Sequence, residues 1–85
     1  MKKSFKSHFA SDVYHARTAI PEFTQAHAAE ILGISLREYQ FIESGDRVPG
    51  AEIFLRLVYL FELNIDNYRE DIFSHVPVSD RKSVV

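Results

Sequence analysis

The segment that most constrains the fold runs from residue 24 to residue 49, TQAHAAEILGISLREYQFIESGDRVP. It predicts two short helices with a tight turn between them at Leu32-Gly33-Ile34-Ser35. Gly33 can adopt the positive φ that ends a helix, and Ser35 can accept a hydrogen bond from a free amide at the start of the next one. Thr24 is placed to cap the first of the two helices in the same way. Small side chains inside that helix let the second one cross it closely at a steep angle.

The second of these helices, about Ser35 to Ser44, has two faces of different chemistry. Tyr39 and Ile42 are three residues apart and share one face, which we expect to pack in the core. The other face carries Leu36, Arg37, Gln40 and Phe41. The helix is therefore expected to present a binding surface as well as a core stripe.

This segment resembles the helix-turn-helix of the phage repressor and Cro family, also called the xenobiotic-response-element class of bacterial regulators. The matching features are Thr24-Gln25, Ala29, Leu32-Gly33-Ile34-Ser35 and then Glu43-x-Gly45-x-Arg47-x-Pro49. The apolar spacing of the family's fourth and fifth helices is matched by Phe54, Leu57, Val58, Phe61, Leu63, Ile65, Asp66 and Tyr68. The resemblance covers about Val13 to Phe73. It implies an all-α fold, a compact bundle of five short helices like the lambda-repressor DNA-binding domain, in which helices 2 and 3 form the helix-turn-helix.

The resemblance also implies which side chains contact DNA: Gln25, Leu36, Arg37, Gln40, Phe41 and Arg47. Arg37 can bind guanine O6 and N7 with two hydrogen bonds, and Gln40 can pair with adenine. Leu36 and Phe41 can pack on thymine methyl groups or sugars, although two apolar side chains on an exposed face are also typical of a protein-binding patch.

Two of the six residues match family positions near the DNA backbone. Gln25 begins its helix, where the helix dipole favours a phosphate. Arg47 lies in the loop that follows the second helix. An ion pair of Arg47 with Asp46 or Glu43 is the alternative.

We expect three parts along the chain: a basic N-terminal arm over residues 1–10, the helix-turn-helix domain over residues 11–75, and an extended or disordered tail over residues 76–85. Three lysines and two phenylalanines in residues 1–9 suit a solvated terminus, or an arm that lies along phosphates or enters a minor groove. Ser11 or Asp12 is expected to cap a first helix that ends near Ile20, before Pro21. Its inner side is expected to carry either Val13, Ala16 and Ile20 or Tyr14 and Ala19.

The first helix departs from the family at one position. Family members carry an arginine late in this helix that pairs with the glutamate matching Glu43, and gapless spacing puts Thr18 there. If the linker Ile20-Pro21-Glu22-Phe23 is one residue longer than the family's turn, Arg17 takes the position of the family's arginine. We therefore expect Arg17 and Glu43 to form an ion pair between the first and third helices, with an exposed Glu43 as the alternative.

The fourth helix, Ala51 to Leu63, is apolar almost all round, and only Arg56 and Glu62 interrupt it from Ile53 onward. A core-facing helix needs only an apolar stripe, which family spacing assigns to Phe54, Leu57, Val58 and Phe61. The surplus predicts a two-fold homodimer. The residues expected at its axis are Ile53, Leu55, Tyr59 and Leu60, with Tyr68, Ile72 or Phe73 from a short fifth helix that Asp66 caps.

Composition excludes several functions. The 85 residues include no cysteine, which excludes disulfides, thiolate zinc sites and thiol catalysis. The N-terminal lysines precede no apolar run typical of a secretory signal, and the apolar stretch around residues 53–63 is too short to span a bilayer. The four histidines have no metal-ligand spacing, and the chain has no glycine-rich phosphate loop or nucleophile elbow. We therefore expect a cytoplasmic protein that is not an enzyme, with no cofactor, metal, membrane or small-molecule ligand.

Charge bears on the choice between two functions. The chain holds 10 basic and 12 acidic side chains for a net charge of −2, whereas DNA-binding domains usually show a basic face. Only the docked surface has to be positive, however. The expected function is a sequence-specific DNA-binding transcriptional regulator, a repressor that binds an inverted-repeat operator in double-stranded DNA as a homodimer. The alternative is a protein-interaction module on the same fold, antitoxin-like or a phage-derived partner protein, with weak or no DNA binding.

Overall fold

Helix α1 is longer than the sequence predicts. The computed structural model describes residues 4–73, and in it α1 spans Phe5–Thr18. Ser4 caps this helix by accepting a hydrogen bond from the Ser7 amide at 3.2 Å. The predicted start at Ser11 or Asp12 is therefore wrong. Residues 1–3 of the expected arm and the expected tail over residues 76–85 lie outside the described residues.

Aromatic packing explains the early start of α1. The rings of Phe5 and Phe9 stack with their centroids 5.6 Å apart, and both contact Phe54 and Tyr68. Phe9 is fully buried. Residues 5–10 thus belong to a core helix and not to an arm, because extending the helix buries these rings.

Helices α2 and α3 follow the predicted boundaries closely. Helix α2 spans Gln25–Leu32 and α3 spans Leu36–Ser44, and their caps are Thr24 and Ser35 as predicted. Gly33 adopts φ 75°, and its amide donates to the Glu30 carbonyl while the Ile34 amide donates to the Ala29 carbonyl. This pair of hydrogen bonds is a Schellman motif, which requires a residue in the left-handed conformation at the end of the helix. Gly33 supplies that conformation.

The C-terminal part contains α4 (Ala51–Phe61), the 3-10 helix η1 (Ile65–Tyr68) and α5 (Arg69–Phe73). Helix α4 ends before the predicted Leu63 because Glu62 takes a left-handed conformation with φ 53°. The predicted cap Asp66 is wrong. Asn64 caps η1 instead, since its side-chain oxygen accepts from the Asp66 amide at 3.0 Å.

The core lies where α1, α2, α3, α4 and η1 meet. Its buried residues are Phe9, Val13, Ala28, Ala29, Leu32, Tyr39, Ile42, Leu57, Phe61 and Tyr68. On α1 the first predicted inner face is correct for Val13 and for the partly buried Ala16, but Ile20 is exposed. Tyr68 is 1% exposed, so its predicted place at a dimer axis is wrong.

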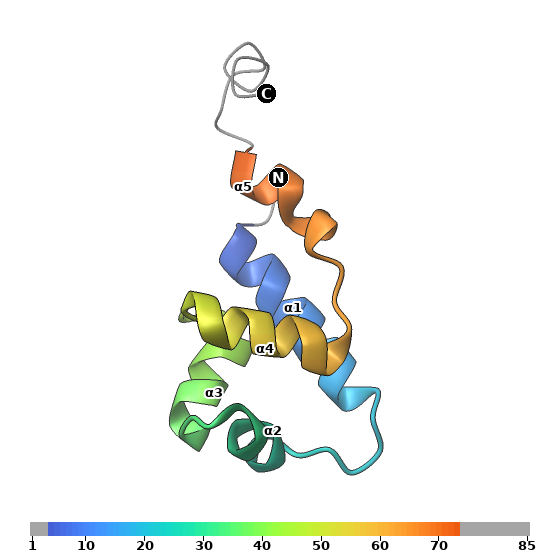
Figure 1. Cartoon of the computed structure of the whole chain (residues 1–85), viewed down its shortest axis with the longest axis vertical. Helices are drawn as coiled ribbons and strands as arrows, with labels where there is room; N and C mark the ends of the chain where they lie inside the picture. Colours follow the sequence, from blue (N-terminus) through green and yellow to red (C-terminus); the bar gives the residue numbers. More distant parts are fainter. Residues whose placement is uncertain (1–3, 74–85) are drawn as a thin grey trace.

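The arrangement places α2 and α5 at opposite ends of the molecule, with α4 crossing α1 between them (Figure 1). Residues 4–73 form five α-helices and one 3-10 helix and contain no strand, which confirms the all-α class. No helix in this part of the chain has both the length and the apolar character needed to cross a lipid bilayer.

Candidate nucleic-acid interface

The inner side of α3 is anchored through the carboxylate of Glu43. Arg17 donates from Nε to Oε2 at 2.8 Å and from Nη2 to Oε1 at 2.9 Å. The Tyr39 hydroxyl donates to Oε2 at 2.6 Å, and the Gln25 amide donates to Oε1 at 2.9 Å. The predicted pair of Arg17 and Glu43 is therefore confirmed, and it is buried, with side-chain exposures of 13% and 3%.

These hydrogen bonds set the protonation states of Glu43, Arg17 and Tyr39. Burial by itself raises the pKa of Glu43, but the hydrogen bonds donated by Arg17, Tyr39 and Gln25 outweigh it and hold that pKa below its usual value. The hydrogen bond to Glu43 raises the pKa of Arg17, and burial together with the same carboxylate raises the pKa of Tyr39. At neutral pH the site thus holds an ionised Glu43, a charged Arg17 and a neutral Tyr39.

The linker between α1 and α2 and the side chain of Tyr39 also hold the pair of Arg17 and Glu43 in place. Arg17 Nη1 donates to the Phe23 carbonyl at 2.8 Å, so the linker itself holds the guanidinium in place. The sequence analysis did not assign Tyr39 a polar role. The signal was present, since Tyr39 and Glu43 are four residues apart and therefore neighbours on one helix face.

The outer side of α3 brings three of the predicted DNA contacts together. Arg37 lies over the Phe41 ring with Cζ 5.5 Å from its centroid, and Arg47 lies over the same ring at 5.0 Å. The ion pair considered for Arg47 does not form: Glu43 pairs with Arg17 instead, and Asp46 accepts from the Ser44 hydroxyl at 2.8 Å. Within residues 4–73 no ion pair links Arg37 or Arg47 to a carboxylate.

A second group joins the two predicted glutamines. The Gln40 amide donates to Gln25 Oε1 at 3.3 Å, while Gln25 donates to Glu43. With Tyr14 and Ser44 these residues line a shallow hollow of about 360 Å³. Gln25 is thus engaged inside the protein, and one amide hydrogen of its side chain remains for a phosphate. Tyr14 is a lining residue that the sequence analysis missed.

Leu36 and several acidic residues also belong to this segment. Leu36 is 43% exposed at the start of α3. Of the four acidic side chains in residues 24–49, Glu43 is buried and paired with Arg17, so its charge does not face solvent. Asp46 accepts a hydrogen bond from Ser44 but is exposed and keeps its charge.

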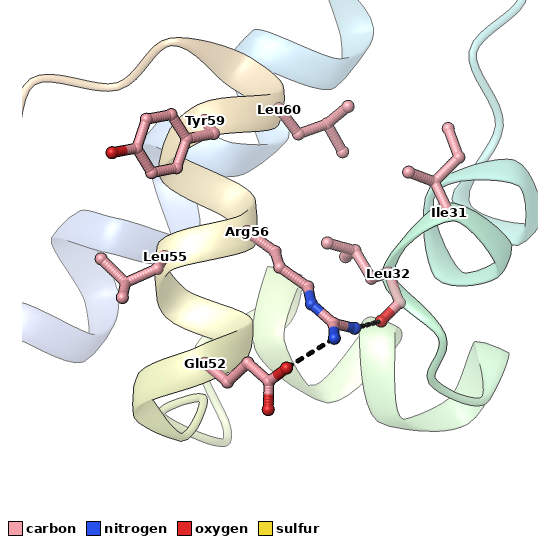
Figure 2. A pocket seen from close by; sticks show the side chains of 7 residues that line it. All are labelled: Ile31, Leu32, Glu52, Leu55, Arg56, Tyr59 and Leu60. Carbon is pink, nitrogen blue, oxygen red and sulfur yellow. Dashed lines mark hydrogen bonds and ion pairs between the residues drawn. The ribbon is translucent and has the colours of Figure 1, made fainter.

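A separate apolar groove of about 460 Å³ lies between α2 and α4. Figure 2 shows Arg56 and Leu60 extending from α4 toward α2, whereas Leu55 and Tyr59 extend away from it. Arg56 donates to the Leu32 carbonyl at the end of α2 at 2.8 Å, which joins α4 to α2 (Figure 2). It also donates to Glu52 of its own helix at 2.6 Å. Tyr59 is 80% exposed and Leu55 is 51% exposed.

Comparison with models of known protein families, with curated proteins and with solved structures finds no match in any of the three. The resemblance to the repressor and Cro class therefore rests on the residues of the chain. The geometry offers one anchored helix whose outer side carries hydrogen-bond donors, and one apolar surface on α4. The first can contact a polar, anionic partner, and the second can contact an apolar one.

Proposed function

We propose that the chain is a sequence-specific DNA-binding transcriptional regulator, a repressor built on the lambda-repressor type of helical bundle. In this proposal α2 and α3 are the helix-turn-helix, and α3 enters the major groove. Arg37 and Gln40 would contact base edges, Leu36 and Phe41 would pack on methyl groups or sugars, and Gln25 and Arg47 would contact the backbone.

The observation that carries the proposal is the contrast between the two sides of α3. Its inner side is fixed by the buried Glu43 network and by Ile42, and its outer side carries Arg37 with no carboxylate partner in residues 4–73. A rigid helix with an unpaired guanidinium on its exposed face is the arrangement that base reading requires, because the donor fork must reach guanine without reorganising the fold.

We further propose that the working unit is a homodimer. One domain offers few cations to phosphate, and a second copy doubles the contacts at high effective concentration. Exposed apolar side chains on α4 and α5 supply a surface for it, namely Leu55, Tyr59, Ile72 and Phe73. They lie on elements other than α2 and α3, so both recognition helices stay available to an inverted-repeat operator.

Selection of binding sites from random duplex DNA with the purified protein tests the proposal. Enrichment of an inverted repeat is expected. Arg37→Ala should then weaken binding to that site by about 1–3 kcal/mol and relax the preference at one base pair, because a bidentate arginine–guanine pair is worth that much. Arg69→Ala is the matched control, since Arg69 is exposed on α5 and should leave the preference unchanged. An identical preference for wild type and Arg37→Ala would refute the assignment of Arg37.

The second candidate function is a protein-interaction module on the same fold. The groove between α2 and α4 and the 80% exposed Tyr59 favour it, because contiguous exposed apolar surface marks contact sites. The same selection separates the two functions. A protein that enriches no sequence, and whose Arg37→Ala variant behaves as wild type, supports the interaction module.

A further inference from the structure

The outer surface of α3 carries one aromatic ring that two arginines contact. Arg37 and Phe41 are one helical turn apart, and Arg47 comes from the loop after the helix. The guanidinium carbons lie 5.5 Å and 5.0 Å from the centroid of the Phe41 ring. Cation–π attraction therefore holds both guanidinium groups against the same ring.

The donors of Arg37 remain available in this arrangement. Within residues 4–73 no hydrogen bond or ion pair engages its guanidinium group. A cation–π contact uses the face of the ring and requires no acceptor atom, so the planar fork of N–H groups keeps its capacity for two hydrogen bonds. Guanine accepts such a fork through O6 and N7 in the major groove.

Phe41 places an apolar group directly beside that fork. Phe41 is half-buried, so part of this residue reaches the surface, and Leu36 next to Arg37 is 43% exposed. The apolar group that a base presents in the major groove is the C5 methyl of thymine, and 5-methylcytosine carries the same group at the same position. An arginine fork beside an apolar contact thus matches two neighbouring bases, a guanine and a methylated pyrimidine.

We propose that Arg37 and Phe41 together recognise a guanine adjacent to a pyrimidine with a C5 methyl group, either thymine or 5-methylcytosine. This inference rests on the proposed DNA-binding function and extends it. Where the pyrimidine is cytosine, binding depends on the methylation state of the DNA. Uracil and unmethylated cytosine lack the group that Phe41 contacts and are bound more weakly.

The test uses the full chain and the site obtained by selection. At each pyrimidine adjacent to a guanine, duplexes carry thymine, uracil, cytosine or 5-methylcytosine, and the dissociation constant is measured for each. Removing the methyl group at the recognised position should raise the dissociation constant about fourfold per half-site. This factor corresponds to the hydrophobic free energy of burying one methyl-sized group. The thymine and uracil pair isolates the methyl of thymine, and the cytosine and 5-methylcytosine pair isolates the methyl added by modification.

Variants assign the effect to Phe41. Phe41→Ala should bind thymine and uracil duplexes equally while keeping the preference for guanine, and Phe41→Leu should keep most of the difference because it retains an apolar side chain. If Phe41→Ala does not fold, the comparison of duplexes with the wild-type protein still decides whether a C5 methyl group is recognised, and Phe41→Leu still tests whether the size of the effect depends on Phe41.

Two outcomes overturn the inference at different levels. Equal affinity for methylated and unmethylated duplexes at every such position, or a selected site with no pyrimidine beside a guanine, overturns methyl recognition and leaves DNA binding intact. Failure to enrich any sequence overturns both.

Discussion

At the scale of single residues, Glu43 decides how α3 is held. Its carboxylate accepts four hydrogen bonds, two from Arg17 and one each from Tyr39 and Gln25. These donors come from α1, α2 and α3, so one buried charge joins three helices. A buried charge is stable only when it is paired and hydrogen-bonded, and this pairing makes the network sensitive to the loss of any one member.

Arg17→Ala should lower the free energy of unfolding by about 3–5 kcal/mol, because it leaves the Glu43 carboxylate buried without its counter-charge. Arg69→Ala is the matched control. Arg69 and its partner Asp66 are 69% and 72% exposed, and loss of such a pair costs under about 1 kcal/mol. Urea denaturation of the wild type and both variants measures the difference. Equal losses for the two variants would contradict a buried, coupled role for Arg17.

Glu43 also makes stability depend on acid pH. Its pKa in the folded chain lies below the ordinary value of 4.5, so the unfolded chain binds a proton more readily. Stability from this group is therefore fully present above about pH 4.5 and is lost as pH falls through the lower, folded-state pKa.

Glu43→Gln, which cannot titrate, provides the comparison. The difference in unfolding free energy between wild type and Glu43→Gln should be constant near neutral pH and should shrink as pH falls below 4.5, the ordinary value for this carboxyl. Urea titrations at a series of pH values from neutral to acid measure it. A difference that grows on acidification would show that the pKa of Glu43 is raised.

At the scale of the elements, glycines end the helices on both sides of the recognition surface. Gly33 and Gly45 have φ values of 75° and 86°, in the left-handed region that other residues adopt at a cost. Gly50, the cap of α4, has φ −66°. The first two glycines therefore have a conformational role that Gly50 lacks.

Gly33→Ala should lower the free energy of unfolding by about 1–2 kcal/mol, because alanine is strained at positive φ. An added Cβ there meets only Arg56 Nη1, at 3.5 Å, so backbone strain dominates over steric clash. Gly50→Ala is the control and should have a smaller effect, since nothing lies within 4 Å of its added Cβ. Thermal or urea unfolding of the two variants tests this order, and a reversed order would refute it.

Polar contacts tie the C-terminal elements to α1. The Tyr68 hydroxyl donates to Asp12 Oδ2 at 2.8 Å, and His8 Nδ1 lies 2.5 Å from Asp71 Oδ2. Burial, together with the hydrogen bond to Asp12, raises the pKa of Tyr68. Helical spacing places His8 next to one carboxylate, that of Asp12 four residues on, so the contact of His8 with Asp71 in α5 could not be predicted from the local sequence.

At the scale of the whole molecule, the proposed dimer predicts the behaviour of surface variants. Leu60, which the sequence also placed at the interface, is half-buried against its own core, so glutamate there would damage the fold. Tyr59 is 80% exposed and is the better probe. Tyr59→Glu should give a folded monomer that binds a half-site weakly and loses cooperative binding to the inverted repeat, because dimerisation sets the recognition helices about 34–36 Å apart.

Sedimentation and DNA titration measure these two properties. Leu36→Glu is the matched control, since Leu36 is 43% exposed on α3 and its replacement should leave the oligomeric state unchanged. A wild-type protein that sediments as a monomer at tens of micromolar would refute the dimer.

The sequence by itself determined the local features of this protein. The turn at Leu32-Gly33-Ile34-Ser35, the caps Thr24 and Ser35, and the inward face of Tyr39 and Ile42 all agree with the structure. Each depends on groups within about one helical turn, such as a hydroxyl that reaches a nearby amide or a glycine at positive φ. The pair of Arg17 and Glu43 was also predictable, but only through the resemblance to a family.

The tertiary structure alone decided the features that join distant residues. Phe5 and Phe9 extend α1 because Phe54 and Tyr68 lie beside them, and Tyr68 is core for the same reason. Arg47 lies over Phe41 because the loop after α3 turns back, with the Arg47 amide donating to the Phe41 carbonyl at 3.2 Å. Helical periodicity states which residues share a face but not what that face meets, and burial and pairing energies depend on the surfaces that come into contact.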